Sequence, residues 1–356
     1  MRKNGATFPR QKHSHPSAEG VDQYKTGVTI FPKMFFGDRE HSSRLFLIQT
    51  FESRLLFLMN LNYKPQHDFL IGIDSDGCAF DTMELKHKEC FVPNTIKYWN
   101  LQGVSKYARE AFEFVNLYSK SRGVNRFPAL IETLQWLQRR PEVKRRGINI
   151  EIPQSLIDWV ARETKLGNPA LKEEVERNPD PGLLQTLEWS LAINKTVDFI
   201  VDKGVPPFPF VRESLEKMKG KADVLVVSAT PQEALVREWE EQDIVRYVAA
   251  ICGQEVGTKK ESLEKAKQIG NYAGNKMLMI GDAPGDHKAA AANGALFFPI
   301  NPGAEEQSWQ RLCVEGLDRF FSETFAGAYQ QELLDEFNRY LPSEPPWEVS
   351  NISGNR

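Results

Sequence analysis

The chain has 356 residues, of which 41% are hydrophobic and 26% charged, so it can bury a core and has a length typical of about two domains. Its 45 basic and 48 acidic residues give a net charge of −3, which excludes the strongly basic surface expected of a nucleic-acid-binding protein. The four cysteines have neither metal-ligand nor redox spacing, which favours a reducing, cytoplasmic compartment.

Residues 1–65 are predicted to be an N-terminal extension that is partly disordered. The first forty residues are polar, lack periodicity and contain no apolar segment of the kind found in signal peptides. Residues 45–59 are richer in apolar side chains, but Gln49, Glu52 and Arg54 interrupt them, and the segment is shorter than the ~20 residues of a spanning helix. We therefore expect no membrane anchor.

Five apolar runs are predicted to be buried strands, at residues 69–74, 224–228, 248–252, 277–281 and 295–298. Helical patterns at residues 231–242, 259–269 and 286–293 alternate with the later runs. Such alternation predicts an α/β fold with a Rossmann-like parallel sheet and helices on both faces. Residues 66–82 and 206–320 form this predicted core.

The segment between the first two strands contains no clear strand pattern. Apolar side chains recur there at helical spacing, among them Tyr107, Ala111, Val115, Leu184, Leu187, Leu191 and Val197. We predict an all-helical cap domain at residues 83–205, inserted into the core, in which the aromatic side chains pack inside. The last predicted segment, residues 321–356, consists of a C-terminal helix and a mobile tail. The helical pattern covers residues 320–341, and the tail follows Pro342.

The densest basic run surrounds Pro141 and ends at Gly147. Its members are Arg139, Arg140, Lys144, Arg145 and Arg146. Charge runs of this kind are usually solvated, so a surface turn between two helices is expected.

Acidic residues follow two of the predicted strands. Asp74 and Asp76 come after the first strand, with Gly77 permitting a sharp turn, and Asp282 and Asp286 come after the fourth. The carboxyl ends of parallel strands lie at one edge of the sheet, where ligands bind in open α/β folds. Carboxylates that meet there would make the all-oxygen site that Mg²⁺ prefers.

Two further features occur in order after Asp74. Ser228 ends the second strand, and Lys259 and Lys260 open a helix after the third. Each feature alone has an ordinary explanation, since an acidic residue after a strand is often a helix cap and a lysine is often exposed. Their order along the chain, each at a strand end or opening the next helix, is what favours a phosphoryl-transfer site.

This ordered set resembles the haloacid dehalogenase (HAD) superfamily of phosphatases. The four motifs are Asp74-Ser-Asp76-Gly77, Val224-Leu-Val-Val-Ser228, the lysine pair, and Gly281-Asp282-Ala-Pro-Gly-Asp286. The helical insertion after the first motif is similar to the mobile cap of the subgroup that includes β-phosphoglucomutase and phosphoglycolate phosphatase. The third motif leaves either Lys259 or Lys260 as its lysine, and we favour Lys259.

The resemblance implies a role for each motif residue. Asp74 would be the nucleophile and a Mg²⁺ ligand, and Asp76 would act as acid and base and give the metal its backbone carbonyl. Asp282 and Asp286 would complete the metal site. Ser228 and the amide of Ala229 would hold the phosphoryl group, and the lysine would offset its charge.

Substrate specificity is expected from the cap. Arg122 or Arg126, in a polar segment after a helical pattern, is a candidate to bind an anionic or hydroxylated substrate, although a plain surface loop is the more common explanation of such a segment. Glu84 and His87 follow the first motif closely enough to enter the site, but a lone histidine is more often structural.

We therefore expect a Mg²⁺-dependent phosphomonoester hydrolase that acts on a small phosphorylated metabolite through an aspartyl-phosphate. The alternatives are a sugar-phosphate mutase with the same core, or a non-catalytic protein that binds a phosphorylated metabolite. Asp76 favours a phosphatase or mutase over a dehalogenase, by resemblance. A monomer or weak homodimer is expected, with neither nucleic acid nor a membrane as partner.

Overall fold

A computed structural model of the chain describes residues 61, 63–201 and 204–348. Its centre is one parallel sheet of five strands in the order β3-β2-β1-β4-β5. The strands are β1 (Phe69–Ile73), β2 (Ala222–Val227), β3 (Ala250–Cys252), β4 (Met277–Gly281) and β5 (Leu296–Pro299). All five predicted runs are strands, with ends that differ by at most two residues. Most of the predicted N-terminal extension, including residues 45–59, lies outside the described residues.

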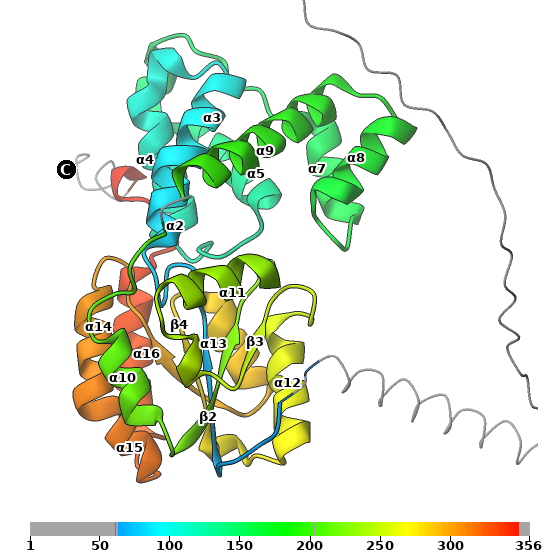
Figure 1. Cartoon of the computed structure of the whole chain (residues 1–356). Coiled ribbons are helices and arrows are strands. Elements are labelled where there is room, and N and C mark those ends of the chain that lie inside the picture. The colour runs from blue at the N-terminus through cyan, green and yellow to red at the C-terminus, as the bar shows by residue number, and fades with distance from the viewer. Residues whose placement is uncertain (1–60, 62, 202–203, 349–356) are drawn as a thin grey trace, which may run out of the picture. The chain divides into compact units, whose positions relative to one another are not determined.

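Helices cover both faces of the sheet (Figure 1), and the alternation of side chains along β1 shows why. Ile71 and Ile73 point to one face, where they join a cluster with side chains of α10 and α11, whereas Leu70 points to the other face, toward α12 and α13. A strand that is buried on both faces reads as a continuous apolar run. The predicted fold class is therefore confirmed.

The helices of the core follow β1 only after a long insertion. They are α10 (Val211–Met218), α11 (Gln232–Glu241), α12 (Lys259–Gly270), α13 (Pro284–Ala292), α14 (Glu305–Arg311), α15 (Leu317–Phe321) and α16 (Ala328–Tyr340). Thr258 and Glu261 form a capping box that fixes where α12 begins. The helix predicted at residues 320–341 is two helices instead, because the chain turns between them at Gly327, whose φ is +85°.

The insertion that follows β1 and ends before α10 contains helices joined by loops, and we call it the helical region. It contains α2 (Thr82–Leu85), α3 (Val92–Tyr98), α4 (Ser105–Leu117), α5 (Arg126–Arg139), α6 (Pro141–Arg145), α7 (Gln154–Arg162), α8 (Asn168–Arg177) and α9 (Pro181–Ile200). A π-helical turn, Lys86–Phe91, links α2 to α3. These helices share a hydrophobic core of their own, in which Phe112, Phe127, Trp159 and Trp189 are buried.

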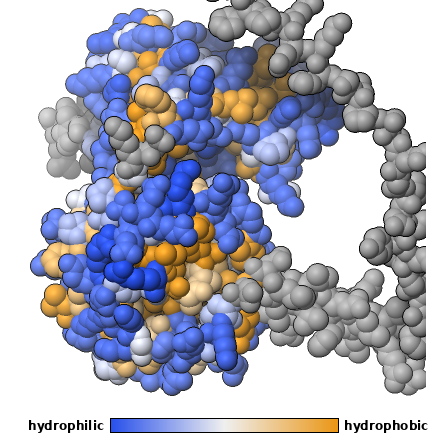
Figure 2. All heavy atoms as spheres, in the orientation of Figure 1, coloured by the Kyte–Doolittle hydropathy of each residue, from blue (hydrophilic) through white to orange (hydrophobic). Residues whose placement is uncertain are grey.

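Helix α9 has apolar side chains on an exposed face as well as on its buried face. Leu187 is buried, but Leu184 and Leu191 are 45% and 51% exposed. These two leucines are seven residues apart and therefore share one face of the helix, which turns away from the core of the helical region. Figure 2 shows a largely hydrophilic surface that hydrophobic patches interrupt. Helical spacing identifies a shared face but not what covers it.

Two further expectations differ from the structure where residues 342–348 pack on the helical region. Arg140, expected in a solvated turn, is 4% exposed, lies over the Tyr107 and Trp347 rings and donates to Glu110. Residues 342–348, expected to be a mobile tail, pack on the helical region, where Trp347 contacts Phe114 edge-on. The aromatic ring and the arginine stem bury each other's apolar surface, which a count of charges does not show.

No helix in the described part of the chain is both long enough and apolar enough to cross a membrane.

Replacement of Trp347 by alanine should lower the free energy of unfolding by about 1–2 kcal/mol, because it removes a half-buried ring from Phe114 and Arg140. Urea unfolding measures this. Val314→Ala is the control, since Val314 is 68% exposed and its loss should change stability by less than about 0.5 kcal/mol. Equal stability of Trp347→Ala and wild type would mean that the C-terminal contact contributes nothing.

Candidate active site

Three buried carboxylates meet at the carboxyl edge of the sheet. Asp74 follows β1, Asp282 follows the neighbouring β4, and Asp286 lies in the first turn of α13. One oxygen of each lies within 4.8 Å of an oxygen of the others. Gly281 makes this approach possible, because a Cβ there would lie 2.5 Å from the Asp286 side chain. The two acidic motifs predicted from the sequence are thus brought together.

A lysine supplies countercharge to this group. Lys259, the first residue of α12, places its Nζ 2.5 Å from Asp74 Oδ2 and 2.5 Å from Asp286 Oδ1. Lys260 is exposed, and its side chain does not reach the carboxylates. Of the two lysines that the sequence left open, the structure therefore places Lys259 in the site. We call Asp74, Lys259, Asp282 and Asp286 the acidic cluster.

Burial and charge oppose each other within the acidic cluster. Burial holds the pKa of Asp74 well above its ordinary value, and the neighbouring carboxylates add to this, while Lys259 acts in the opposite direction. Burial opposes the charge on Lys259, but Asp286 and Asp74 outweigh it and raise the lysine pKa. Three buried carboxylates thus lie around a single lysine.

The oxygens of the cluster differ in what they already bind. Both oxygens of Asp286 accept hydrogen bonds, Oδ1 from Lys259 and Oδ2 from the amides of Asp282 and Ala283. Asp282 Oδ1, in contrast, is buried without a hydrogen-bond partner among the described residues. A buried oxygen of this kind needs a ligand, and a donor set made of carboxylate oxygens suits Mg²⁺. The side chains of this site therefore fit the predicted cation.

Asp76 lies apart from the acidic cluster and has its own partners. Its carboxylate accepts hydrogen bonds from Thr82 Oγ1 at 2.5 Å and from Lys86 Nζ at 2.9 Å. Burial works against ionisation, but Lys86 and Thr82 more than offset it, so the pKa of Asp76 lies below its ordinary value. Both partners belong to the helical region, which therefore holds the group predicted to be acid and base.

Lys86 was not identified from the sequence. Its signal was the spacing to Thr82, because residues four apart on a helix share a face and can bind one side chain together. This spacing alone could not show that the shared face points at Asp76.

Ser75, between the two aspartates, anchors the loop to α11. Its hydroxyl donates to Glu238 Oε2 at 3.0 Å and accepts from Trp239 Nε1 at 2.9 Å. Ser75 also donates its backbone N–H to Asp74 Oδ1 at 2.8 Å. The orientation of the Asp74 carboxylate therefore depends on side chains of the core helix as well as on Lys259.

The second motif lies on the next strand along the sheet. Ser228 directly follows β2, which pairs with β1, so it ends at the same edge as Asp74. Its backbone N–H donates to Cys252 O at 3.0 Å, and its Oγ accepts from the amide of Thr230. Ala229 is exposed. Neither residue contacts the acidic cluster directly, so both stand beside it at the open edge.

Arg122 occupies a position that the sequence did not suggest. It lies between α4 and α5 with a 1% exposed side chain, and its Nε donates to Asp282 Oδ2 at 2.6 Å. The expected alternative, an exposed surface loop, is therefore wrong for this residue. Arg122 lies in the candidate active site, where it binds a carboxylate of the acidic cluster; it was expected to bind substrate.

Arg126 lies four residues further on and points elsewhere. Its guanidinium donates to Ser190 Oγ and Asn194 Oδ1 on α9 and lies 5.0 Å from the centre of the Phe91 ring. Burial lowers its pKa to about 10. The structure does not bring Arg126 to the acidic cluster.

Glu84 and His87 have structural partners near the first motif. Glu84 accepts hydrogen bonds from Lys88 and Tyr118. The His87 ring stacks on Phe91, and burial lowers its pKa to about 3, so it is neutral near pH 7. Neither side chain contacts the acidic cluster.

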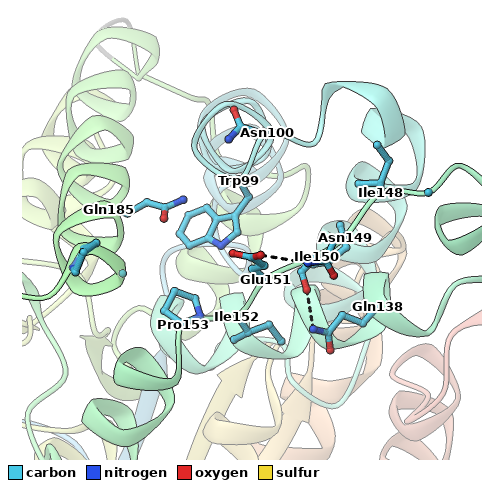
Figure 3. Close-up of a pocket in the computed structure, with 13 residues that line it drawn as sticks. Trp99, Asn100, Gln138, Ile148, Asn149, Ile150, Glu151, Ile152, Pro153 and Gln185 are labelled. Carbon is cyan, nitrogen blue, oxygen red and sulfur yellow. Dashed lines mark hydrogen bonds between the residues drawn. The ribbon is translucent and has the colours of Figure 1, made fainter.

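A separate hollow lies within the helical region (Figure 3). It has a volume of about 870 Å³ and is lined by Trp99, the 147–153 segment and the beginning of α9. Glu151 is the charged residue of this lining, and no basic side chain takes part in it. A phosphate group would therefore find no basic side chain in this lining.

Comparisons with known proteins bear on the fold. Neither protein-family descriptions nor curated proteins gave a match. Solved structures do match: a β-phosphoglucomutase from Clostridium difficile is 12% identical, with 74% of this chain and 100% of that chain covered and a TM-score of 0.43. A predicted phosphoglycolate phosphatase from Haemophilus somnus is 14% identical over 65% and 84%, with a TM-score of 0.40. A HAD hydrolase from Bacillus subtilis, solved with magnesium, is 14% identical over 67% and 88%, with a TM-score of 0.35.

These solved structures are described as a β-phosphoglucomutase, a predicted phosphoglycolate phosphatase and a HAD hydrolase, and this chain is similar to each of them. With identities this low and TM-scores below 0.5, the matches do not extend to substrate or mechanism. The chemistry of this chain rests on its own side chains.

Glu238 gives a stability prediction that depends on pH. Burial raises its pKa from 4.5 to about 7, although nearby Lys86 opposes this and Asp76 adds to it. Between these pH values the folded protein keeps a proton on Glu238 that the unfolded chain releases. The stabilisation of the folded state by this bound proton is fully present below pH 4.5 and is lost as the pH rises through 7. Glu238→Gln should therefore gain about 1–3 kcal/mol relative to wild type between pH 5 and pH 8.

Urea unfolding of both proteins at the two pH values measures this gain. Glutamine is chosen because its amide oxygen can still accept the hydrogen bond from Ser75. Glu240→Gln on the same helix is the control, because Glu240 is exposed. A constant difference between Glu238→Gln and wild type at both pH values would contradict the proposed burial effect.

Proposed function

We propose that this protein is a Mg²⁺-dependent phosphomonoester hydrolase that acts through an aspartyl-phosphate on Asp74. The observation that carries the proposal is the acidic cluster, with Asp76 two residues after Asp74 and held separately by Thr82 and Lys86. A nucleophile, an acid/base and a charge-neutralising site are the three parts that phosphoryl transfer needs. The substrate class that fits is a small phosphorylated metabolite.

Asp74 is suited to attack phosphorus. Ser75 N–H and Lys259 each bind one of its oxygens, which fixes the plane of the carboxylate at the edge of the sheet. In the first step a carboxylate oxygen forms a bond to phosphorus while the bond from phosphorus to the leaving oxygen breaks. A bound Mg²⁺ would be held by Asp74 and Asp282, with Asp286 beside them and the backbone carbonyl of Asp76, and would neutralise charge on the phosphoryl oxygens.

Asp76 has the complementary role. It would give a proton to the leaving oxygen in the first step, and in the second it would take one from the water that attacks phosphorus and frees Asp74. Ser228 and Ala229, at the adjacent strand end, are proposed to hold the phosphoryl oxygens. Arg126, at a distance from the cluster, stays a proposed contact for the rest of the substrate.

The helical region would act as a cap on this site. It supplies Thr82 and Lys86 to Asp76, so the position of the acid/base depends on where this region lies. Exclusion of bulk water by such a region would favour transfer to the enzyme and protect the intermediate.

Asp74→Asn should reduce Mg²⁺-dependent hydrolysis of p-nitrophenyl phosphate by at least about 10³-fold, because an amide cannot attack phosphorus. EDTA should reduce wild-type hydrolysis similarly, and added Mg²⁺ should restore it. Asp68→Asn is the control, since Asp68 is 86% exposed at the side chain just before the same strand. Full activity of Asp74→Asn would overturn the assignment.

Lys86→Met should lower kcat by about 10–100-fold with less than about a threefold change in KM, because Asp76 loses one of two partners that position it. Lys86→Arg should restore part of kcat. Lys88→Met is the control, since Lys88 pairs with Glu84 instead. A rise in KM alone would assign Lys86 to substrate binding rather than to positioning Asp76.

A further inference from the structure

Arg122 makes an ion pair that joins the helical region to the acidic cluster. Its side chain and that of Asp282 are each 1% exposed, and 2.6 Å separates Arg122 Nε from Asp282 Oδ2. Nη1 also donates to Leu117 O at 2.8 Å, within the helical region. Burial opposes the charge on Arg122, but Asp282 outweighs it and raises the pKa of the guanidinium. The guanidinium therefore keeps its charge, and the pair is shielded from solvent.

The backbone next to Arg122 also lies directly against the core. Gly123 has a φ of +78°, and a Cβ there would lie 2.9 Å from the Cβ of Ala283, the residue after Asp282. Arg122 Nη2 lies 3.5 Å from Gly77 O, in the loop that carries Asp74 and Asp76. This loop of the helical region thus touches both acidic motifs, and Arg122 cannot hold Asp282 unless the region lies in this position.

The charges of the site decide what this contact does to a cation. When its three carboxylates are ionised, as cation binding requires, the acidic cluster carries three negative charges, of which Lys259 neutralises one and Arg122 a second. A single net negative charge is left for a divalent cation, and two would be left if Arg122 withdrew. Buried charges interact more strongly than exposed ones, so a change of one unit alters cation affinity substantially.

We propose that Arg122 opposes Mg²⁺ binding while it holds Asp282, and that the affinity of the site for Mg²⁺ therefore depends on the position of the helical region. This rests on the proposed function, because it takes the acidic cluster to be the Mg²⁺ site. Asp282 Oδ1 stays free for the cation, so the opposition comes from charge, not from competition for one oxygen.

Coupling of this kind is reciprocal. If the Arg122 contact weakens Mg²⁺ binding, then Mg²⁺ weakens the Arg122 contact by the same factor. Mg²⁺ alone should therefore loosen the segment between α4 and α5, without any substrate.

The first experiment measures Mg²⁺ affinity by isothermal titration calorimetry in the absence of substrate. Arg122→Gln should bind Mg²⁺ at least about 10-fold more tightly than wild type, and Arg122→Lys should stay close to wild type because it keeps the charge. Arg126→Gln is the matched control: it removes the same charge from a neighbouring residue that contacts Ser190 and Asn194, and its affinity should not change. An equal or weaker affinity of Arg122→Gln, in a protein that unfolds at the wild-type temperature, would overturn the proposal.

Failure of the proposed function gives a different result. If Asp282→Asn binds Mg²⁺ as tightly as wild type, or if neither wild type nor Arg122→Gln binds it, then the acidic cluster is not a Mg²⁺ site. Loss of binding in Asp282→Asn together with unchanged binding in Arg122→Gln would keep the site and reject the role of Arg122.

The second experiment uses the wild-type protein. Hydrogen–deuterium exchange of peptides that cover residues 118–125 should become faster on addition of Mg²⁺, while peptides from α8, elsewhere in the helical region, should be unaffected. Slower or unchanged exchange at residues 118–125 would contradict the reciprocal effect and reject the coupling.

Discussion

The acidic cluster imposes the main physical constraint on this structure, because three carboxylates are buried within 4.8 Å of one another. Such an arrangement is costly unless positive charge and hydrogen bonds compensate for it. Lys259, Arg122 and the amides after β4 each meet part of this need. The pairing of β1 with β4 brings Asp74 and Asp282 close together, and the missing Cβ of Gly281 lets Asp286 approach them.

The compensating groups come from both parts of the described chain. The core supplies Lys259 and, through Ser75, the α11 anchor, whereas the helical region supplies Arg122 to Asp282 and Lys86 to Asp76. Each acidic motif is therefore bound to a side chain of the helical region. In a hydrolase of the proposed kind, movement of that region would change the charge at the metal site and the position of the acid/base together.

Much of the fold followed from local patterns. Strands that are buried on both faces appear as apolar runs, and capping residues such as Thr258 mark where helices begin. The patterns said less about burial in two cases. In the first a side chain has both apolar and polar parts, and in the second a helix has apolar residues on two faces. Arg140 was therefore expected in solvent and is buried against rings, whereas the helical spacing of Leu184 did not show that its side chain is exposed.

The sequence by itself determined which carboxylates would meet, because Asp74 and Asp282 each end a strand of one parallel sheet and such ends lie at a common edge. Only the tertiary structure decided between Lys259 and Lys260, since two adjacent helical residues point in directions about 100° apart and the facing element selects one of them. It alone placed Arg122 on Asp282, which is 160 residues away along the chain. Contacts at such separations depend on how the helical region packs, and no local pattern encodes them.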